Sequence, residues 1–240
     1  MKKIVSLSSL CLIVAATVSI HTAWAQMPGP GSMPGNGALN SLTTIYQKLS
    51  FTSMAVITLE GVLPKPLEMS FAMHEGKGRV EMDMTKMMAD QGMPGGIPGF
   101  DKMVIITRPD KKIVYQVIPG LKGYVEMPIP STQDTDGDKV ERTVLGDESV
   151  DGRACQKVKV AVAGKDGQKT DITLWEAKDL GGIPVKAQAQ TAQGLVNMQF
   201  KNIKAGNPGA ATFDVPAGLT QYTSFQELMM GAMMQKMGAK

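Results

Sequence analysis

The chain offers few side chains capable of catalysis, and the two that stand out are the imidazole of His74 and the thiol of Cys155. Hydrolysis through a serine or cysteine nucleophile requires an imidazole base beside that nucleophile. No Gly-x-Ser-x-Gly, phosphate-binding glycine loop or His-Glu-x-x-His motif occurs in the sequence. We therefore interpret His74 as a solvated surface histidine. Cys155 is interpreted as a small buried hydrophobe, with intermolecular pairing or redox sensing as its alternative, and we expect no catalytic residue and no enzyme.

Methionine is the unusual component of the composition, with 19 in the chain. One group lies between residues 69 and 93 and a second between residues 229 and 237. Thioether sulfur is a soft ligand that selects Cu(I), so either group could hold copper. The first group alternates along predicted strands and the second follows one side of a predicted helix, which is typical of core packing or of an apolar lining. We expect core or lining, keep a Cu(I)-binding protein as the alternative, and assign no metal ligand.

The acidic segment 134–138 has the spacing of the start of a calcium loop. Such a loop requires glycine at its sixth position and a bidentate glutamate at its twelfth. Lys139 and Leu145 occupy those positions, so the segment lacks the two residues that distinguish a calcium loop from other acidic segments. We interpret this segment as a solvent-exposed loop and expect neither a metal nor another cofactor.

The N-terminal residues predict the compartment. A basic start and an apolar run over residues 4–20 are followed by the small residues Ala23 and Ala25, which is the pattern of a cleaved secretory signal peptide over residues 1–25. The apolar run is shorter than the roughly 20 residues that a membrane span needs, and no later segment approaches that length. We expect a mature, periplasmic chain that starts at Gln26.

The remaining composition excludes several classes of function. Loss of Lys2 and Lys3 with the signal leaves 23 basic and 22 acidic residues, a balance that gives no electrostatic reason to expect a nucleic acid partner. Cys155 is then the single cysteine, which excludes an intramolecular disulfide. The stability of the protein must therefore come from an ordinary hydrophobic core.

Hydrophobic periodicity predicts the elements that position these side chains. Residues 26–37 are dense in proline and glycine and predict a disordered leader, whereas residues 38–48 have helical spacing. A second helix is predicted over residues 225–237, and residues 85–100 predict one or two helical turns before a Gly/Pro loop. Between the two helices the period is two, which predicts strands over 51–60, 67–73, 79–84, 103–108, 112–118, 123–127, 140–148, 153–163, 170–177, 185–191 and 194–204.

Short turns join these strands, with almost no helix between them. This arrangement predicts a mainly antiparallel sheet rather than parallel units with crossover helices. A sheet of about ten to eleven strands must curl, close or split. We therefore expect one strongly curved sheet.

Six stretches, taken in their order, resemble a known family. They are 77–81 (Lys-Gly-Arg-Val-Glu), 105–115 (Ile-Ile-Thr-Arg-Pro-Asp-Lys-Lys-Ile-Val-Tyr), 123–128 (Gly-Tyr-Val-Glu-Met-Pro), 145–160 around Asp-Gly-Arg-Ala-Cys, 174–186 around Leu-Trp-Glu-Ala-Lys-Asp-Leu, and 213–218 (Phe-Asp-Val-Pro-Ala-Gly). Together they resemble a periplasmic domain-of-unknown-function family of the 4412 type in the LolA/LolB-like lipoprotein-carrier superfamily, over most of residues 40–222. The resemblance implies an incomplete β-barrel with a helical lid over an apolar cavity, and relatives that carry lipids or lipoproteins across the envelope.

These observations lead to one expected architecture and function. We expect a mainly β (α+β) LolA/LolB-like open barrel over residues 38–222, followed by a methionine-rich helix or tail over residues 223–240. The expected function is non-catalytic binding of an apolar ligand, a lipid or a lipoprotein acyl chain. The alternatives are Cu(I) binding and an envelope stress-sensing or protein-interaction module of the same fold. We expect a monomer whose partners are a lipid or lipidated protein and envelope proteins.

Periodicity also gives seven candidates for the lining of the cavity, and for each of them plain core packing is the alternative. They are Phe71, Met73, Met82, Met84, Ile106, Val114 and Trp175.

Overall fold

The computed structural model describes residues 45–59, 65–90, 98–129, 139–163, 169–191 and 194–237. The predicted signal peptide, the predicted leader, most of the predicted helix over residues 38–48 and the acidic segment 134–138 lie outside these residues.

Alternating apolar residues form strands at every predicted segment. The strands are β1 Ser50–Leu59, β2 Leu67–His74, β3 Lys77–Asp83, β4 Lys102–Arg108, β5 Ile113–Ile118, β6 Gly123–Pro128, β7 Lys139–Val150, β8 Arg153–Ala163, β9 Lys169–Ala177, β10 Pro184–Thr191, β11 Gly194–Ala205 and β12 Thr220–Tyr222. The sequence reading missed β12 because three residues are too few to show a period of two. β12 pairs with β6 and is the one parallel neighbour among these strands.

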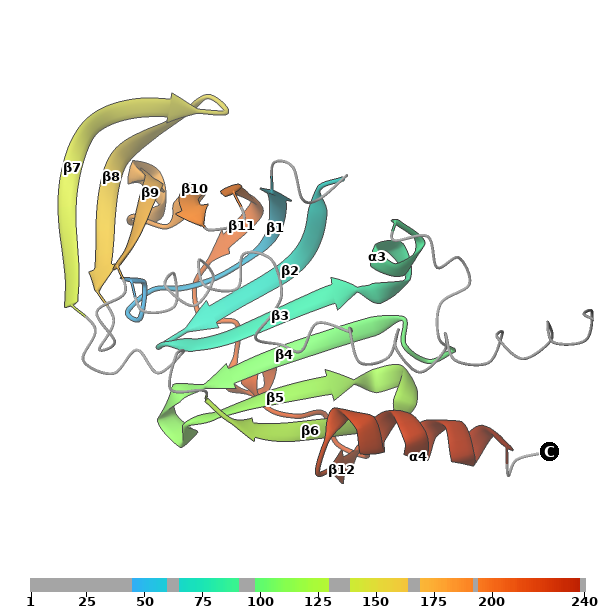
Figure 1. Ribbon diagram of the computed structural model, residues 1–240. Coiled ribbons are helices and arrows are strands. Elements are labelled where there is room, and N and C mark those ends of the chain that lie inside the picture. Colours follow the sequence, from blue (N-terminus) through green and yellow to red (C-terminus); the bar gives the residue numbers. More distant parts are fainter. Residues whose placement is uncertain are drawn as a thin grey trace, which may run out of the picture. The chain divides into compact units, whose positions relative to one another are not determined.

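The strands form one sheet that is curved and unclosed, which confirms the predicted fold class (Figure 1). Their order is β12-β6-β5-β4-β3-β2-β1-β11-β10-β9-β8-β7. This order puts ten inter-strand steps between β6 and β7, or about 48 Å if the sheet were flat. The eleven residue steps from Pro128 to Lys139 reach at most about 40 Å. The connection between β6 and β7 is therefore too short for a flat sheet.

Two-residue turns fix the register of two hairpins. Glu75 and Gly76 join β2 to β3 with φ angles of 49° and 76°, and Asp151 and Gly152 join β7 to β8 with φ angles of 51° and 79°. Two successive positive φ values are typical of type I′ turns, whose twist matches that of the flanking strands. The register of each hairpin determines which side chains share a face of the sheet.

Strand pairing divides the side chains between two faces, because successive residues of a strand point to opposite sides. Face 1 is defined by Ser53, Ala55, Ile57, Met69, Phe71, Met73, Val80, Met82, Met103, Ile105, Val114, Gln116, Val125, Val158, Leu174 and Met198. Face 2 is defined by Met54, Ser70, Ala72, Arg79, Glu81, Val104, Ile106, Arg108, Tyr115, Val117, Tyr124, Lys157, Trp175 and Lys186. Both faces carry buried apolar residues.

A segment from the C-terminal part of the chain covers part of face 2. Phe213, in the short helix η4 (Ala210–Phe213), is fully buried against a cluster that includes Val104 and Ile106. Arg79 donates a hydrogen bond of 3.1 Å to the carbonyl oxygen of Thr212, and Arg108 donates one of 3.1 Å to that of Phe213. The part of face 2 around Val104 and Ile106 is thus covered by a segment of the same chain.

Within the described residues, two α-helices flank the sheet. α3 (Met84–Asp90) follows β3 directly, and α4 (Phe225–Met237) packs beside β6 and β12 (Figure 1). The bounds of α4 match the predicted helix, and its Leu228 is fully buried. Within the described ranges, no helix has the length and apolar character that crossing a membrane would need. The remaining short helices are η1 Pro109–Lys111, η2 Pro119–Leu121 and η3 Lys178–Leu180.

Candidate ligand-binding face

Three methionines form a row across the middle of face 1. Met69 of β2 lies directly opposite Met82 of β3, which lies directly opposite Met103 of β4. Directly paired residues have Cβ atoms about 4.5–5.5 Å apart, so neighbouring side chains of this methionine row can touch. All three are at most 5% exposed. Unbranched thioether side chains adapt their shape to irregular apolar partners, which makes this row a flexible lining.

The next row on face 1 contains a solvent-accessible part. Val80 of β3 lies opposite Ile105 of β4, and both side chains are partly exposed. On their two sides Phe71 and Gln116 are buried, at 3% and 4% exposure. An apolar strip over Val80 and Ile105 is therefore open to water between buried neighbours.

Two polar atoms of this same row are buried without a hydrogen-bond partner in the described structure. They are the Ser53 hydroxyl and the Gln116 amide oxygen. Ser53 lies opposite Phe71, and Gln116 lies opposite Ile105. A buried polar atom with no partner costs about 1–3 kcal/mol, so such atoms are rare in native proteins. Their presence in an otherwise apolar row requires a reason.

Aromatic packing borders the row at β1. The rings of Phe51, Phe71 and Phe200 lie within 5.7–6.4 Å of each other, centroid to centroid. Such tilted and edge-to-face pairs add about 0.5–1.5 kcal/mol each to the burial of the rings. This cluster forms a rigid wall beside the flexible methionine row.

A buried carboxylate lies farther along face 1. Glu176 of β9 is 7% exposed and accepts hydrogen bonds of 2.7 Å from the Tyr46 hydroxyl and from the Arg142 guanidinium. Burial, followed by the charge and the hydrogen bond of Glu176, raises the pKa of Tyr46 above its ordinary value, although Arg142 opposes this. The cluster holds the turn at residues 45–48 against the sheet.

The seven residues predicted to line a cavity are all buried, but they do not lie together. Phe71, Met73, Met82 and Val114 are on face 1. Ile106 packs under Phe213 on face 2, and Trp175 is on face 2 with the ammonium groups of Lys157 and Lys186 at 4.9 and 4.3 Å from its ring. One ligand on one face cannot contact all seven.

Met84 was predicted at the end of a strand, and this assignment is wrong. β3 ends at Asp83, and Met84 is the first residue of α3. The Asp83 carboxylate accepts hydrogen bonds from the backbone N–H groups of Thr85 and Lys86, at 2.9 and 3.2 Å. Aspartate is a strong N-cap, so it starts the helix one residue before the apolar alternation ends.

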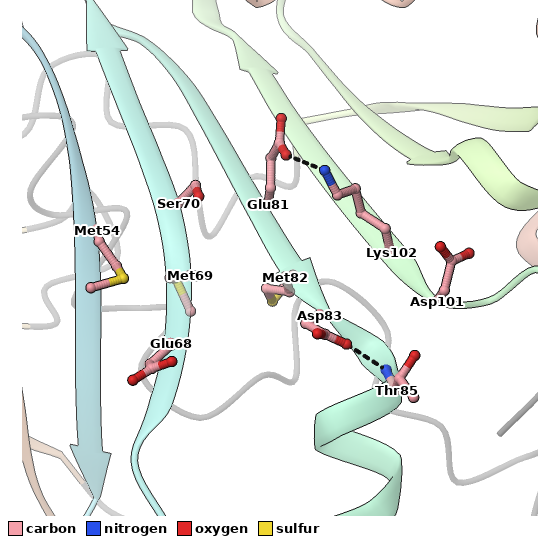
Figure 2. A pocket seen from close by; sticks show the side chains of 10 residues that line it. All are labelled: Met54, Glu68, Met69, Ser70, Glu81, Met82, Asp83, Thr85, Asp101 and Lys102. Carbon is pink, nitrogen blue, oxygen red and sulfur yellow. Dashed lines mark hydrogen bonds and ion pairs between the residues drawn. The ribbon is translucent and has the colours of Figure 1, made fainter. Parts of the chain in front are cut away.

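A pocket of about 430 Å³ lies along β1–β4 (Figure 2). Seven of its ten lining residues are polar, and the other three are methionines. The polar ones are Glu68, Ser70, Glu81, Asp83, Thr85, Asp101 and Lys102, and the methionines are Met54, Met69 and Met82. Burial opposes ionisation of Glu81, but hydrogen bonds from Lys102 and Arg79 outweigh it and hold the pKa of that carboxyl below its ordinary value. Glu68 pairs with Lys86, and Asp83 caps α3. These charged side chains disfavour an acyl chain in this pocket.

The two residues with catalytic potential are both mostly buried. The interpretation of His74 as a solvated surface residue is wrong: its side chain is 16% exposed, its Nδ1 lies 2.7 Å from the Ser50 hydroxyl, and its ring stacks on Phe213. Cys155 is 1% exposed, and burial raises the pKa of its thiol. Among the described residues, no group of three or more histidine, cysteine or acidic side chains is arranged to hold a metal ion.

Sequence reasoning did not find Met103, Ile105 and Gln116 as members of this face. Alternation alone gives no information here, because Val104 and Ile106 on the other side of β4 are equally apolar. The signal that identifies them is cross-strand pairing, which requires the register. Gln116, a polar residue within the apolar strand β5, was the one local signal available.

The fold and this apolar face define a class of mostly antiparallel, open and curved sheet proteins. Residues 56–183, more than half of the chain, match the family described as "Domain of unknown function (DUF4412)". The chain belongs to this family. No curated protein matches the full sequence.

Solved structures with related sheets were also found. The chain is similar to LprF from Mycobacterium bovis, with 19% identity over 80% of this chain and 99% of that one and a TM-score of 0.38. It is similar to the MucA/MucB complex of Pseudomonas aeruginosa, with 16% identity over 78% and 62% and a TM-score of 0.39. It is also similar to a LolA superfamily protein from Nitrosomonas europaea, with 10% identity over 70% and 91% and a TM-score of 0.34.

Proposed function

We propose that this protein is a non-catalytic, periplasmic binding protein for an apolar ligand, the acyl chain of a lipid or of a lipidated protein, which it holds on face 1. The observation that carries the proposal is the water-accessible apolar strip over Val80 and Ile105 beside the methionine row. Phe71, Met73, Met82 and Val114 are the predicted lining residues that remain in this proposal. The compartment rests on the signal-peptide pattern of residues 1–25.

Binding works through burial. An acyl chain that lies over Val80 and Ile105 leaves water, and each buried methylene contributes about 0.8 kcal/mol. The methionine row repacks around chains of different shape, because each side chain has three rotatable bonds and no branch. The helix predicted over residues 38–48 lies outside the described residues before residue 45, and Tyr46 ties the described turn to Glu176.

Two measurements test the proposal: native mass spectrometry of gently purified protein, and displacement of a bound fluorescent fatty acid. We expect lipid adducts and saturable displacement. Val80→Gln introduces a polar group into the strip and is expected to weaken binding about tenfold. Val56→Gln is the matched control, because Val56 is a partly exposed valine on the opposite face of β1. Absence of both adducts and saturable binding, or equal losses in the two variants, would overturn the proposal.

The methionine row also supports a second candidate function, binding of Cu(I). Three neighbouring thioethers form the soft ligand set that Cu(I) prefers. A competitive Cu(I) titration should compare the wild type with the variant Met69→Leu, Met82→Leu, Met103→Leu. The control replaces Met230 and Met234 of α4 by leucine, because both are exposed. Loss of affinity confined to the row variant would favour copper, whereas equal affinity in all three proteins removes this candidate.

A further inference from the structure

We infer that the ligand of face 1 is an amphiphile that carries an O–H or N–H group, and that this group donates a hydrogen bond to the amide oxygen of Gln116. The inference rests on the proposed function and specifies the chemical class of the ligand. It predicts weaker binding of plain hydrocarbon chains and of chains whose only polar atoms are acceptors.

The orientation of the Gln116 amide follows from its neighbour Met103. The amide Nε2 donates a hydrogen bond of 3.1 Å to the thioether sulfur of Met103. Sulfur in a thioether accepts but cannot donate, so the amide nitrogen and not the oxygen must face it. The oxygen Oε1 is therefore turned elsewhere, and within the described ranges it has no hydrogen-bond partner.

The position of Gln116 places its side chain beside the proposed ligand. Gln116 is 4% exposed and lies directly opposite Ile105, which in turn lies opposite Val80. Cross-strand neighbours are about 5 Å apart, so a chain seated over Val80 and Ile105 brings its next atoms to Gln116. An acceptor at the end of an apolar strip selects a ligand with an apolar chain and a terminal donor.

Ser53 supplies an internal control at the other end of the row. Its hydroxyl is also buried and without a partner in the part of the chain that the structure describes. A hydroxyl both donates and accepts, so Ser53 cannot distinguish a donor ligand from an acceptor ligand. Along the sheet it lies four strand spacings from Gln116, about 19 Å.

The test compares two probes that differ in one hydrogen-bond donor, 1-dodecanol and dodecyl methyl ether. Both are measured by displacement of a fluorescent fatty acid from the full chain. We expect the wild type to bind the alcohol about tenfold more tightly, which corresponds to about 1.4 kcal/mol. The extra methyl group of the ether favours the ether, so a preference for the alcohol reports the donor.

Two variants assign that preference to Gln116. Gln116→Leu is expected to bind both probes with no preference for the alcohol, and its ligand-free form is expected to unfold at a higher temperature because the unpaired amide is removed. Gln116→Met serves if the leucine variant fails to fold. Ser53→Ala is expected to keep the preference of the wild type.

The outcomes separate this inference from the proposed function. Equal binding of the two probes by the wild type, or an unchanged preference in the Gln116 variants, overturns the inference and leaves apolar binding standing. Binding of neither probe by the wild type overturns the proposed function, and the inference with it.

Discussion

The hydroxyl of Tyr46 donates a hydrogen bond of 2.7 Å to the carboxylate of Glu176, a residue 130 positions later in the chain. Both side chains are buried, at 5% and 7% exposure, and the guanidinium of Arg142 completes the cluster at 2.7 Å from the same carboxylate. A single polar contact thus fixes the first described turn of the chain on β9, at the border of face 1.

Removal of the Tyr46 hydroxyl should destabilise the protein. Hydrogen bonds to charged groups contribute about 1.5–3 kcal/mol, so Tyr46→Phe is expected to lower the free energy of unfolding by about 2 kcal/mol. Urea denaturation measures this loss. Tyr124→Phe is the control, because its hydroxyl makes an exposed 3.1 Å hydrogen bond to Gln221, and its effect should stay below about 0.5 kcal/mol. Equal losses in the two variants would show that the hydrogen bond to Glu176 contributes no more to stability than an exposed one.

The same contact should make stability depend on alkaline pH. Burial and then Glu176 raise the pKa of Tyr46 in the folded protein, whereas tyrosine in the unfolded chain ionises near pH 10. The folded state therefore keeps a proton that the unfolded state releases. The contribution of Tyr46 is fully present below about pH 10 and is lost as the pH rises from there toward the folded pKa. The stability difference between wild type and Tyr46→Phe should shrink above pH 10, and a constant difference would contradict this explanation.

Arg108 should hold η4 on face 2. Its side chain is 11% exposed, lies 2.7 Å from the Asp214 carboxylate and donates to the carbonyl oxygen of Phe213. We expect Arg108→Met to lower the free energy of unfolding by about 2 kcal/mol and to increase proteolysis within residues 207–219. Arg153→Met is the matched control, because Arg153 pairs with Asp179 at the surface, where such pairs contribute less than about 1 kcal/mol. Similar costs for the two variants would count against this role.

Cys155 should be inert in the folded protein. Burial raises the pKa of its thiol and excludes reagents, and the thiolate is the reactive form. We expect its reaction with a thiol reagent at pH 8 to be at least about 100-fold slower in the folded than in the urea-unfolded protein. Ser149→Cys places a thiol at an exposed position of β7 and should react without unfolding. Reaction of Cys155 at the rate of that introduced thiol would disprove its burial.

The strands could be predicted from the sequence because the patterns that specify them extend over only a few neighbouring residues. Alternation along β1 and β2 and the Glu75-Gly76 and Asp151-Gly152 turns act over a few residues, and the structure contains strands and turns there. β12 was not predicted, because its position depends on pairing with β6 and not on its own three residues. The start of α3 at Met84 depended on the Asp83 cap, a local signal that the apolar alternation concealed.

The sequence by itself determined that this chain forms a large sheet with short turns, and that a sheet of so many strands must curl, close or split. Only the tertiary structure decided which face each apolar residue occupies. Ile106 and Trp175 are as apolar as Phe71, yet segments and side chains far away in the sequence bury them on face 2. The methionine row and the unpaired Gln116 oxygen likewise exist because register aligns residues of separate strands, and register is a property of pairing that no single segment contains.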